Sequence, residues 1–227
     1  MLQDTDGKKE TSRSDAGSAG YVYQPLDLTD DTREFRLLRL LPSKDFDDNI
    51  RCELFHSPFD SYEALSYTWG DPHVTVPVLL HGIHHHVTTN LALALRYIRY
   101  EDRPRIMWID ALCINQKDIL EKNHQVAQMR EIFLDAEQVV VWLGEEGSAK
   151  SAIDLCKLIK ERAPRGDDPL SAEELAQHSE GFQACGELFH QRPWWKRTWI
   201  IQEVLHTNPV KVCIGKLRMG LDDLYYM

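Results

Sequence analysis

A single carboxylate set among tryptophans and basic residues is the most unusual chemical feature of the sequence. Residues 192–203 contain three Trp, three basic residues and one acid, Glu203. Glu203 follows Trp199 by four residues in a segment with a helical pattern, so both side chains are expected on one helix face. Indole rings exclude water from an ionised carboxylate, and an acid in such surroundings suits proton transfer or the stabilisation of a cationic transition state. The competing interpretation is that the tryptophans are core and that Glu203 pairs with Arg192 or Arg197.

Three more polar clusters directly follow predicted strands, where open α/β sheets bind their ligands. They occupy residues 67–71, 110–116 and 142–145. None of them is a phosphate loop, because neither a GxxxxGK[ST] nor a GxGxxG pattern occurs. Asp110, at the end of one such strand, suits either a binding site or the capping of the following turn.

Other candidate groups have simpler structural explanations. Cys113 with His124 could form a nucleophile and base, whereas a buried core thiol is the competing interpretation. The run His84–His86 could bind a metal, but adjacent strand residues point to opposite faces and no carboxylate or cysteine pattern completes a site, so we predict none. Asp118 and Glu121 suit the first turn of a helix, where acids favour the helix dipole.

Hydrophobic periodicity predicts the helices and strands that must position these groups. From Glu63 onward strands alternate with helices, and the run Val139–Val141 lacks polar alternation, as in strands covered on both faces. We therefore predict an α/β fold whose central sheet is mostly parallel and flanked by helices, with an N-terminal β-hairpin. Strands are expected at 34–41, 50–55, 63–69, 74–80, 84–87, 105–110, 138–143 and 210–214, and helices at 91–99, 120–134, 149–162, 171–178, 182–190 and 200–205.

Composition excludes several classes of protein. The 227 residues carry a formal charge of −10, which argues against a surface that coats nucleic acid. No apolar run is long enough to span a membrane, and residues 1–20 lack the apolar segment of a secretory signal. The five cysteines are scattered, which indicates reduced thiols rather than a disulfide framework or a zinc site.

The polar residues 1–20 are predicted to be a disordered tail, and residues 21–227 a single domain. The sequence ends inside an amphipathic segment, residues 221–226, as the N-terminal part of a longer protein would.

Four motifs, in the family's order, resemble the fungal heterokaryon-incompatibility (HET) domain. The first is YEALSYTWGD at 62–71 and the second is WIDALCINQKD at 108–118; the resemblance continues through residues 121–133. The third is VVVWLG at 139–144, and the last comprises RPW at 192–194 with Arg197, Trp199 and residues 202–204. The resemblance extends from Tyr62 to Gly215.

Membership of this family implies a fungal cytoplasmic protein that triggers regulated cell death when genetically different hyphae fuse. HET domains are in turn remotely similar to TIR domains, several of which cleave NAD at the nicotinamide–ribose bond or assemble as scaffolds. This similarity implies a TIR-like or flavodoxin-like sheet, with NAD as substrate rather than as a permanently bound cofactor. It also implies a homo-oligomer that acts with a sensor protein or a C-terminal module.

By the same resemblance, Glu203 is the expected catalytic residue. The substrate-binding residues are expected to be Tyr67, Trp69, Gly70, Asp71, Asp110, Asn115, Gln116, Trp142, Arg197 and Trp199. Two alternatives stay open: a non-enzymatic module that oligomerises and recruits death-pathway partners, and a hydrolase that uses Cys113 and His124.

Overall fold

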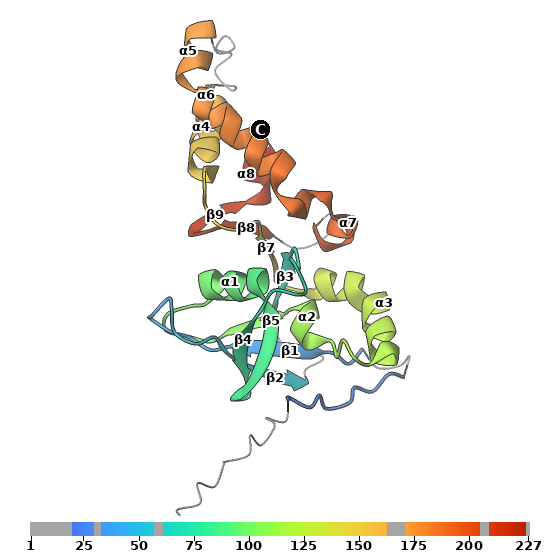
Figure 1. Cartoon of the computed structure of the whole chain (residues 1–227). Coiled ribbons are helices and arrows are strands. Elements are labelled where there is room, and N and C mark those ends of the chain that lie inside the picture. The colour runs from blue at the N-terminus through green and yellow to red at the C-terminus, as the bar shows by residue number, and fades with distance from the viewer. Residues whose placement is uncertain (1–19, 30–32, 57–60, 163–170, 205–208, 226–227) are drawn as a thin grey trace, which may run out of the picture.

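The structure, a computed structural model, describes residues 20–29, 33–56, 61–162, 171–204 and 209–225. Nine strands form one sheet in the order β5-β4-β2-β1-β6-β3-β7-β8-β9 (Figure 1). The strands are β1 (Arg36–Leu40), β2 (Arg51–His56), β3 (Glu63–Tyr67), β4 (Thr75–Leu80), β5 (Ile83–Thr88), β6 (Arg105–Trp108), β7 (Gln138–Trp142), β8 (Val210–Ile214) and β9 (Leu217–Gly220).

The helices lie between and beyond these strands. They are α1 (Thr89–Ile98), α2 (Asp110–Cys113), α3 (Ile119–Asp135), α4 (Ala149–Arg162), α5 (Ala172–Gln177), α6 (Ser179–Gly186), the π-helix η2 (Glu187–Gln191), the 3₁₀-helix η3 (Pro193–Lys196), α7 (Ile200–Val204) and α8 (Leu221–Tyr225). The α/β class is confirmed, and the helices α4, α5 and α6 extend away from β1 and β2 (Figure 1). Sequence patterning missed α2 and β9, which span only four residues each.

The prediction of a mostly parallel sheet is wrong, because the sheet is mixed. The central strands β6, β3, β7 and β8 are parallel to one another, as expected for strands joined by helices. However, β1–β2, β1–β6, β4–β5 and β8–β9 pair antiparallel. Short connections can join only antiparallel neighbours, and three of these four pairs are hairpins. A likeness to TIR or flavodoxin sheets stays a prediction.

The N-terminal hairpin is confirmed and is built into the sheet. Leu38 of β1 faces Leu54 of β2 on one side and Met107 of β6 on the other. The parallel pairing of β2 with β4 then adds the second hairpin to this edge. One continuous core runs through all of these strands, so the hairpins belong to the same packed unit as the parallel centre.

Helix caps follow the chemistry of the sequence. The hydroxyl of Thr88 caps α1, one residue before the expected cap. Asp118 caps α3 by accepting from the amides of Leu120 and Glu121. The predicted Ser-x-x-Glu capping box is confirmed at Ser171, the residue before α5. These caps fix the residues at which α1, α3 and α5 begin.

All five cysteines are free thiols. The predicted disordered tail lies, apart from Gly20, outside the described residues, and the single-domain assignment stays a prediction. Within the part of the chain that the structure describes, no helix is long and apolar enough to cross a membrane.

Two glycines with left-handed backbone differ in the space around them, which makes a steric prediction testable. Gly215, after β8, has φ +54°, and a Cβ there would lie 2.8 Å from the backbone nitrogen of Glu146. Gly82, in the turn between β4 and β5, has φ +78°, and no atom lies within 4 Å of the position that its Cβ would take. The first position is therefore restricted by backbone and by space, the second by backbone alone.

We predict that Gly215→Ala lowers the free energy of unfolding by about 2–4 kcal/mol, because steric overlap with backbone adds to the cost of a left-handed alanine. Gly82→Ala, the matched control, should cost only about 1–2 kcal/mol. Urea titrations followed by circular dichroism measure both values. Equal losses in the two variants would contradict the steric argument.

Candidate functional site

The carboxylate of Glu203 is buried against the carboxyl end of β3. Glu203 is 1% exposed, and Arg197 donates to both of its oxygens, over 2.9 and 2.7 Å. The hydroxyl of Ser66, on β3, also donates to this carboxylate, and the indole nitrogen of Trp194 donates to that hydroxyl oxygen over 2.8 Å. The ion pair with Arg197 confirms one part of the competing interpretation, the pairing of Glu203 with an arginine.

The three tryptophans of residues 192–203 do not form one aromatic wall around Glu203. Trp194 is buried, whereas Trp199 is 49% exposed. Trp199 directly precedes the first residue of α7. The Glu203 amide nevertheless donates to the Trp199 carbonyl over 3.2 Å, as in a helix, so the shared helix face stays a prediction.

Arg192, the other arginine considered as a partner of Glu203, holds the loop after β7 instead. Its guanidinium donates to the carbonyls of Leu143 and Glu145 over 2.9 and 2.7 Å. Gly144 makes room for it: with φ +105°, a Cβ there would lie 2.7 Å from a guanidinium nitrogen. Arg192, the arginine of the RPW motif, thus stabilises the loop after β7.

Asp110 forms a second carboxyl group at the same edge of the sheet. It follows β6 and opens α2, where its oxygens accept from the indole of Trp69 and from the amide of Ala111, each over 2.7 Å. Burial is the main cause that raises the pKa of Asp110; the two hydrogen bonds oppose this shift, and the charge of Glu203 adds to it. Asp110 thus accepts from the amide of the next residue in the first turn of α2 and also belongs to the cluster, while its role in binding stays a prediction.

The Tyr67 hydroxyl completes the cluster. Tyr67 is 2% exposed, and its pKa is raised well above the usual value, first by burial and then by Asp110. The charges of Glu203 and Arg197 both act on Asp110 at the ends of β3 and β6, and the charge of Arg197 also acts on Tyr67. Two carboxyl groups, one guanidinium and one phenol meet where parallel strands end.

A cavity of about 560 Å³ opens beside this cluster. Four of the predicted substrate-binding residues line it: Tyr67, Trp69, Asn115 and Gln116. Trp69, which is 39% exposed, contributes its ring to the cavity and its indole N–H to Asp110, and thereby joins the cavity to the carboxyl cluster. The side-chain amide of Gln116 donates to the carbonyl of Asp110 over 2.9 Å.

Three other predicted substrate-binding residues shape the nearby turn rather than the cavity wall. Trp142 is 1% exposed, and its indole donates to the side-chain oxygen of Asn90 over 3.1 Å. Asn90 in turn donates to the carbonyl of Thr68, and a Cβ on Gly70 (φ +81°) would lie 3.3 Å from the Cβ of Asn90. Asp71 is exposed and accepts from the backbone amide two residues later. Asn90 is a positioning residue that sequence reasoning missed.

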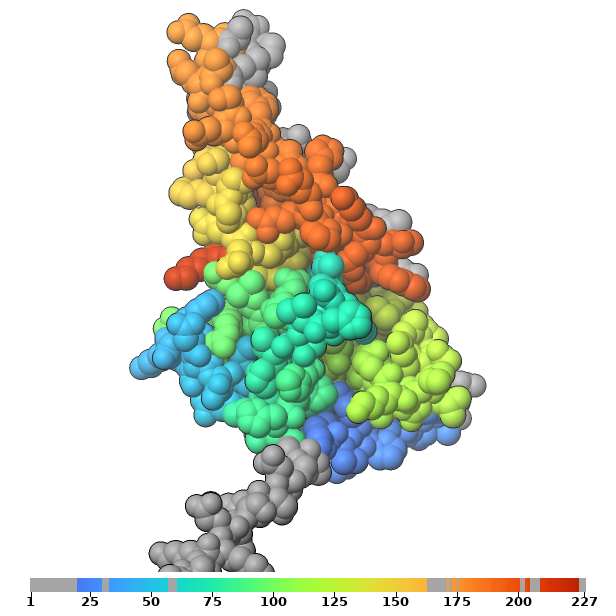
Figure 2. Space-filling model, viewed as in Figure 1, coloured from blue at the N-terminus to red at the C-terminus, as the bar shows by residue number. Residues whose placement is uncertain are grey.

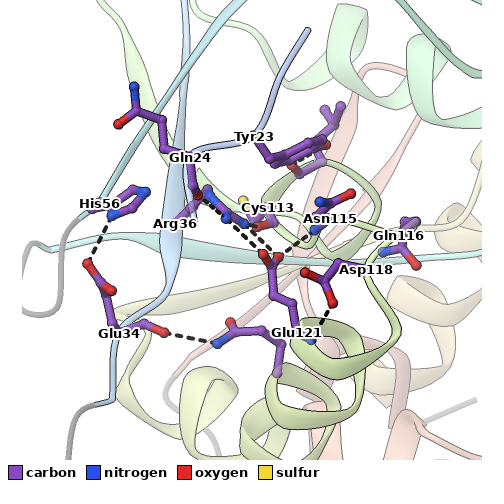
Figure 3. A network of polar contacts seen from close by, with 12 residues as sticks. Tyr23, Gln24, Glu34, Arg36, His56, Cys113, Asn115, Gln116, Asp118 and Glu121 are labelled. Atoms are coloured by element: carbon purple, nitrogen blue, oxygen red, sulfur yellow. Dashed lines mark hydrogen bonds and ion pairs between the residues drawn. The ribbon is translucent and has the colours of Figure 1, made fainter. Parts of the chain in front are cut away.

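A second buried ion pair, between Arg36 and Glu121, holds the segment that carries Asn115 of the cavity wall (Figure 3). Arg36 of β1 donates to both oxygens of Glu121, over 2.7 and 2.9 Å, and both residues are almost fully buried. Arg36 also donates to the carbonyl of Cys113, and the amide of Asn115 donates to Glu121 over 2.6 Å. Glu121 is thus more than the helix-opening acid expected from its position. No local pattern could reveal it, because its partner lies 85 residues away.

The thiol and histidine candidates occupy unreactive positions. Cys113 is fully buried, and burial raises the pKa of its thiol to about 12, which leaves little thiolate for nucleophilic attack. His124 pairs with Gln128 instead. In β5, His84 and His86 are exposed and His85 is partly buried, which is the alternation expected of a strand. Across the described ranges, no three His, Cys, Asp or Glu side chains are arranged to hold a metal ion.

Comparison with known proteins places the chain in a family. The family model described as Heterokaryon incompatibility protein (HET) matches residues 62–203, more than half of the chain. The chain belongs to the HET family. The matched region includes every predicted site residue, whereas the hairpin β1–β2 and the strands β8 and β9 of the same sheet lie outside it.

The HET chain is also similar to a curated protein of Neurospora crassa, Heterokaryon incompatibility protein 6, OR allele. The two are 29% identical over 242 residues, which cover 85% of this chain and 35% of that protein. The chain thus spans about a third of the length of the curated relative that it matches. No solved structure matches the chain.

The raised pKa of Asp110 predicts how stability depends on pH. Its folded-state pKa lies above the usual value of 3.8, so the folded protein keeps a proton that the unfolded chain has already lost. This costs no stability below pH 3.8, and the free energy of unfolding falls as pH rises from there through the folded pKa. Asp110→Asn should remove this cost, and its melting temperature relative to wild type should increase from pH 4 to pH 7. Thermal melts across this range measure the difference. Exposed Asp71→Asn is the control, and a difference that falls with pH for Asp110→Asn would refute the assignment.

Proposed function

We propose that this HET chain acts as an effector of regulated cell death in fungal non-self recognition, and that it does so by cleaving the nicotinamide–ribose bond of NAD. Family membership and the name of the Neurospora relative support the biological role. The observation that carries the chemical part is the meeting of Asp110, Glu203 and Tyr67 beside a cavity with an exposed indole, at the carboxyl edge of parallel strands.

The reaction needs a stabilised cation. When the bond between the ribose and nicotinamide breaks, the electron pair leaves with neutral nicotinamide and the ribose becomes an oxocarbenium-like centre. Water then adds to that carbon and loses a proton, so that NAD⁺ and water give ADP-ribose, nicotinamide and H⁺. A carboxylate near the ribose stabilises the cation or holds its hydroxyls, and the exposed face of Trp69 can flank a planar ring.

The two carboxyl groups differ in their readiness for this role. Both oxygens of Glu203 are held by Arg197, so its negative charge is compensated in this arrangement. Glu203 can act on a ribose cation only after Arg197, whose side chain is 19% exposed, moves away from it. Asp110 accepts from neutral donors, Trp69 and Ala111. We therefore propose that Asp110 shares the catalytic role expected of Glu203.

A non-enzymatic signalling module is the second candidate function. The observation that favours it is the exposure of large side chains in the C-terminal helical part, where Trp199 is 49% and Phe182 41% exposed. Aromatic side chains of this kind serve as anchors of protein–protein contacts. In this version the HET domain forms homo-oligomers and recruits a death-pathway partner.

The direct test of NAD cleavage is a time course of nicotinamide release by the purified chain at high protein concentration, with products separated by chromatography. Glu203→Gln and Asp110→Asn should each lower the rate about 100-fold or more, because a charge that stabilises the transition state is lost. Glu63→Gln is the matched control: Glu63 forms a buried pair with Arg105 at the opposite end of the same two strands. It should retain the rate within about threefold.

Melting temperatures separate catalytic from structural effects, since both Gln variants weaken a buried ion pair. An active, folded Glu203→Gln chain would remove Glu203 from the mechanism. If the folded wild-type chain releases no nicotinamide, even when it is forced to cluster, the NAD proposal fails and the signalling module is favoured.

A further inference from the structure

A second cavity, of about 410 Å³, lies at the other end of α1 and is strongly basic. Its lining includes five cationic side chains and one acidic one, Glu101, in a chain whose formal charge is −10. The cations are Lys44, Arg96, Arg99, Lys216 and Arg218. The first cavity is lined by the start of α1, at Thr88 and Leu91, so the two cavities are separate.

Two of these cations are fixed in place by uncharged partners. Arg96 donates to the carbonyls of Phe46 and Asp48, over 2.7 and 2.9 Å. Arg99 donates to the carbonyl of Asp45 over 2.8 Å and to that of Asn49 over 3.2 Å. Carbonyl groups orient a guanidinium without cancelling its charge, so the loop after β1 holds the two arginines as cations.

The other cations come from distant segments of the chain. Arg218 donates to the carbonyl of Tyr97, 121 residues away, and thereby ties the start of β9 to α1. Lys216 lies in the turn before β9 and Lys44 in the loop after β1, and both are exposed. In Figure 2 the red C-terminal segment and the blue segment before β2 project on the same side of the molecule.

Negative charges compensate this group only in part, because the nearby acids that the structure describes form no ion pair with its members. Within the described ranges, none of the five cations forms an ion pair within 4.0 Å. The carboxylate of Asp48 is nearby, but its ion pair is with Arg51, and it also accepts from Ser43 and from the amide of Asn49. Burial is the main cause that lowers the pKa of Arg99; the charge of Arg96 adds to this shift, and those of Asp48 and Asp45 oppose it.

An aromatic pair lines the same cavity. Phe46 is 40% exposed, and its ring packs edge-to-face on Tyr97 with the ring centroids 4.9 Å apart. A flat, exposed ring beside clustered cations offers a stacking surface and a phosphate-binding surface to one ligand.

We propose that this cavity is a binding site for a nucleoside di- or triphosphate, whose phosphates contact the basic cluster and whose base stacks on Phe46. The proposal rests on this cavity alone and is independent of NAD cleavage. The two exposed lysines supply charge to the phosphates without supporting the fold, whereas the arginines also hold the surrounding loops.

The test is calorimetric titration of the whole chain with ATP, inorganic tripolyphosphate and adenosine at physiological salt. ATP should bind, tripolyphosphate more weakly, and adenosine weakest of all. The double variant Lys44→Gln/Lys216→Gln should lower ATP affinity about tenfold or more. Phe46→Ala should lower ATP affinity about five- to tenfold and leave tripolyphosphate binding unchanged.

The control for net charge is Lys122→Gln/Lys150→Gln, which removes two exposed lysines elsewhere and should retain ATP affinity within about twofold. Absence of ATP binding to the folded chain would overturn the proposal, as would equal weakening by the two double variants. Vesicles that contain phosphatidylinositol bisphosphate form a last arm: capture by these vesicles without ATP binding would assign the cluster to a lipid headgroup and also overturn the proposal.

Discussion

The need to pair every charge buried beside the sheet is the constraint on which this architecture depends. An isolated carboxylate in the position of Glu203 would cost several kcal/mol, because it is shielded from water. Ser66, Trp194 and Arg197 remove that cost, and they come from β3, η3 and the segment before α7. The pair therefore attaches the C-terminal helical segment to the end of a central strand and determines where α7 lies.

The pair of Arg36 and Glu121 acts in the same way on the other part of the site. It joins β1 to α3, and the Asn115 amide that it holds belongs to the cavity wall. Arg36 lies outside the region matched by the HET family. The N-terminal hairpin is thus part of the support of the site, and a chain cut to the matched region would leave Glu121 buried without its arginine.

Sequence patterning predicted those parts of the fold that depend on local information. The unbroken run Val139–Val141 identified a strand buried on both faces, and the polar segment 43–49 identified a hairpin. The mostly parallel sheet was wrong because the helix-linked strands form only its centre, and strand order across β2 and β4 leaves no local signal.

The same distinction holds in the site. The motifs placed Trp69 and Asp110 at the ends of neighbouring strands, and the structure joins them by a hydrogen bond. The partners of the buried charges could not be predicted, since Ser66 and Glu203 are 137 residues apart. The exposure of Trp199 was equally hidden, because the spacing of the tryptophans does not show which indole faces solvent.

Trp142, which was predicted to bind substrate, instead positions other residues. Its indole N–H holds Asn90, which holds the carbonyl just before Trp69 in the chain. Trp142 also contacts the far end of α1. Its ring packs on Tyr97, with the ring centroids 5.2 Å apart, and Tyr97 packs on Phe46. One buried side chain thus fixes both ends of α1 against the sheet. Because each cavity is lined by one end of this helix, the packing around Trp142 sets the shape of both.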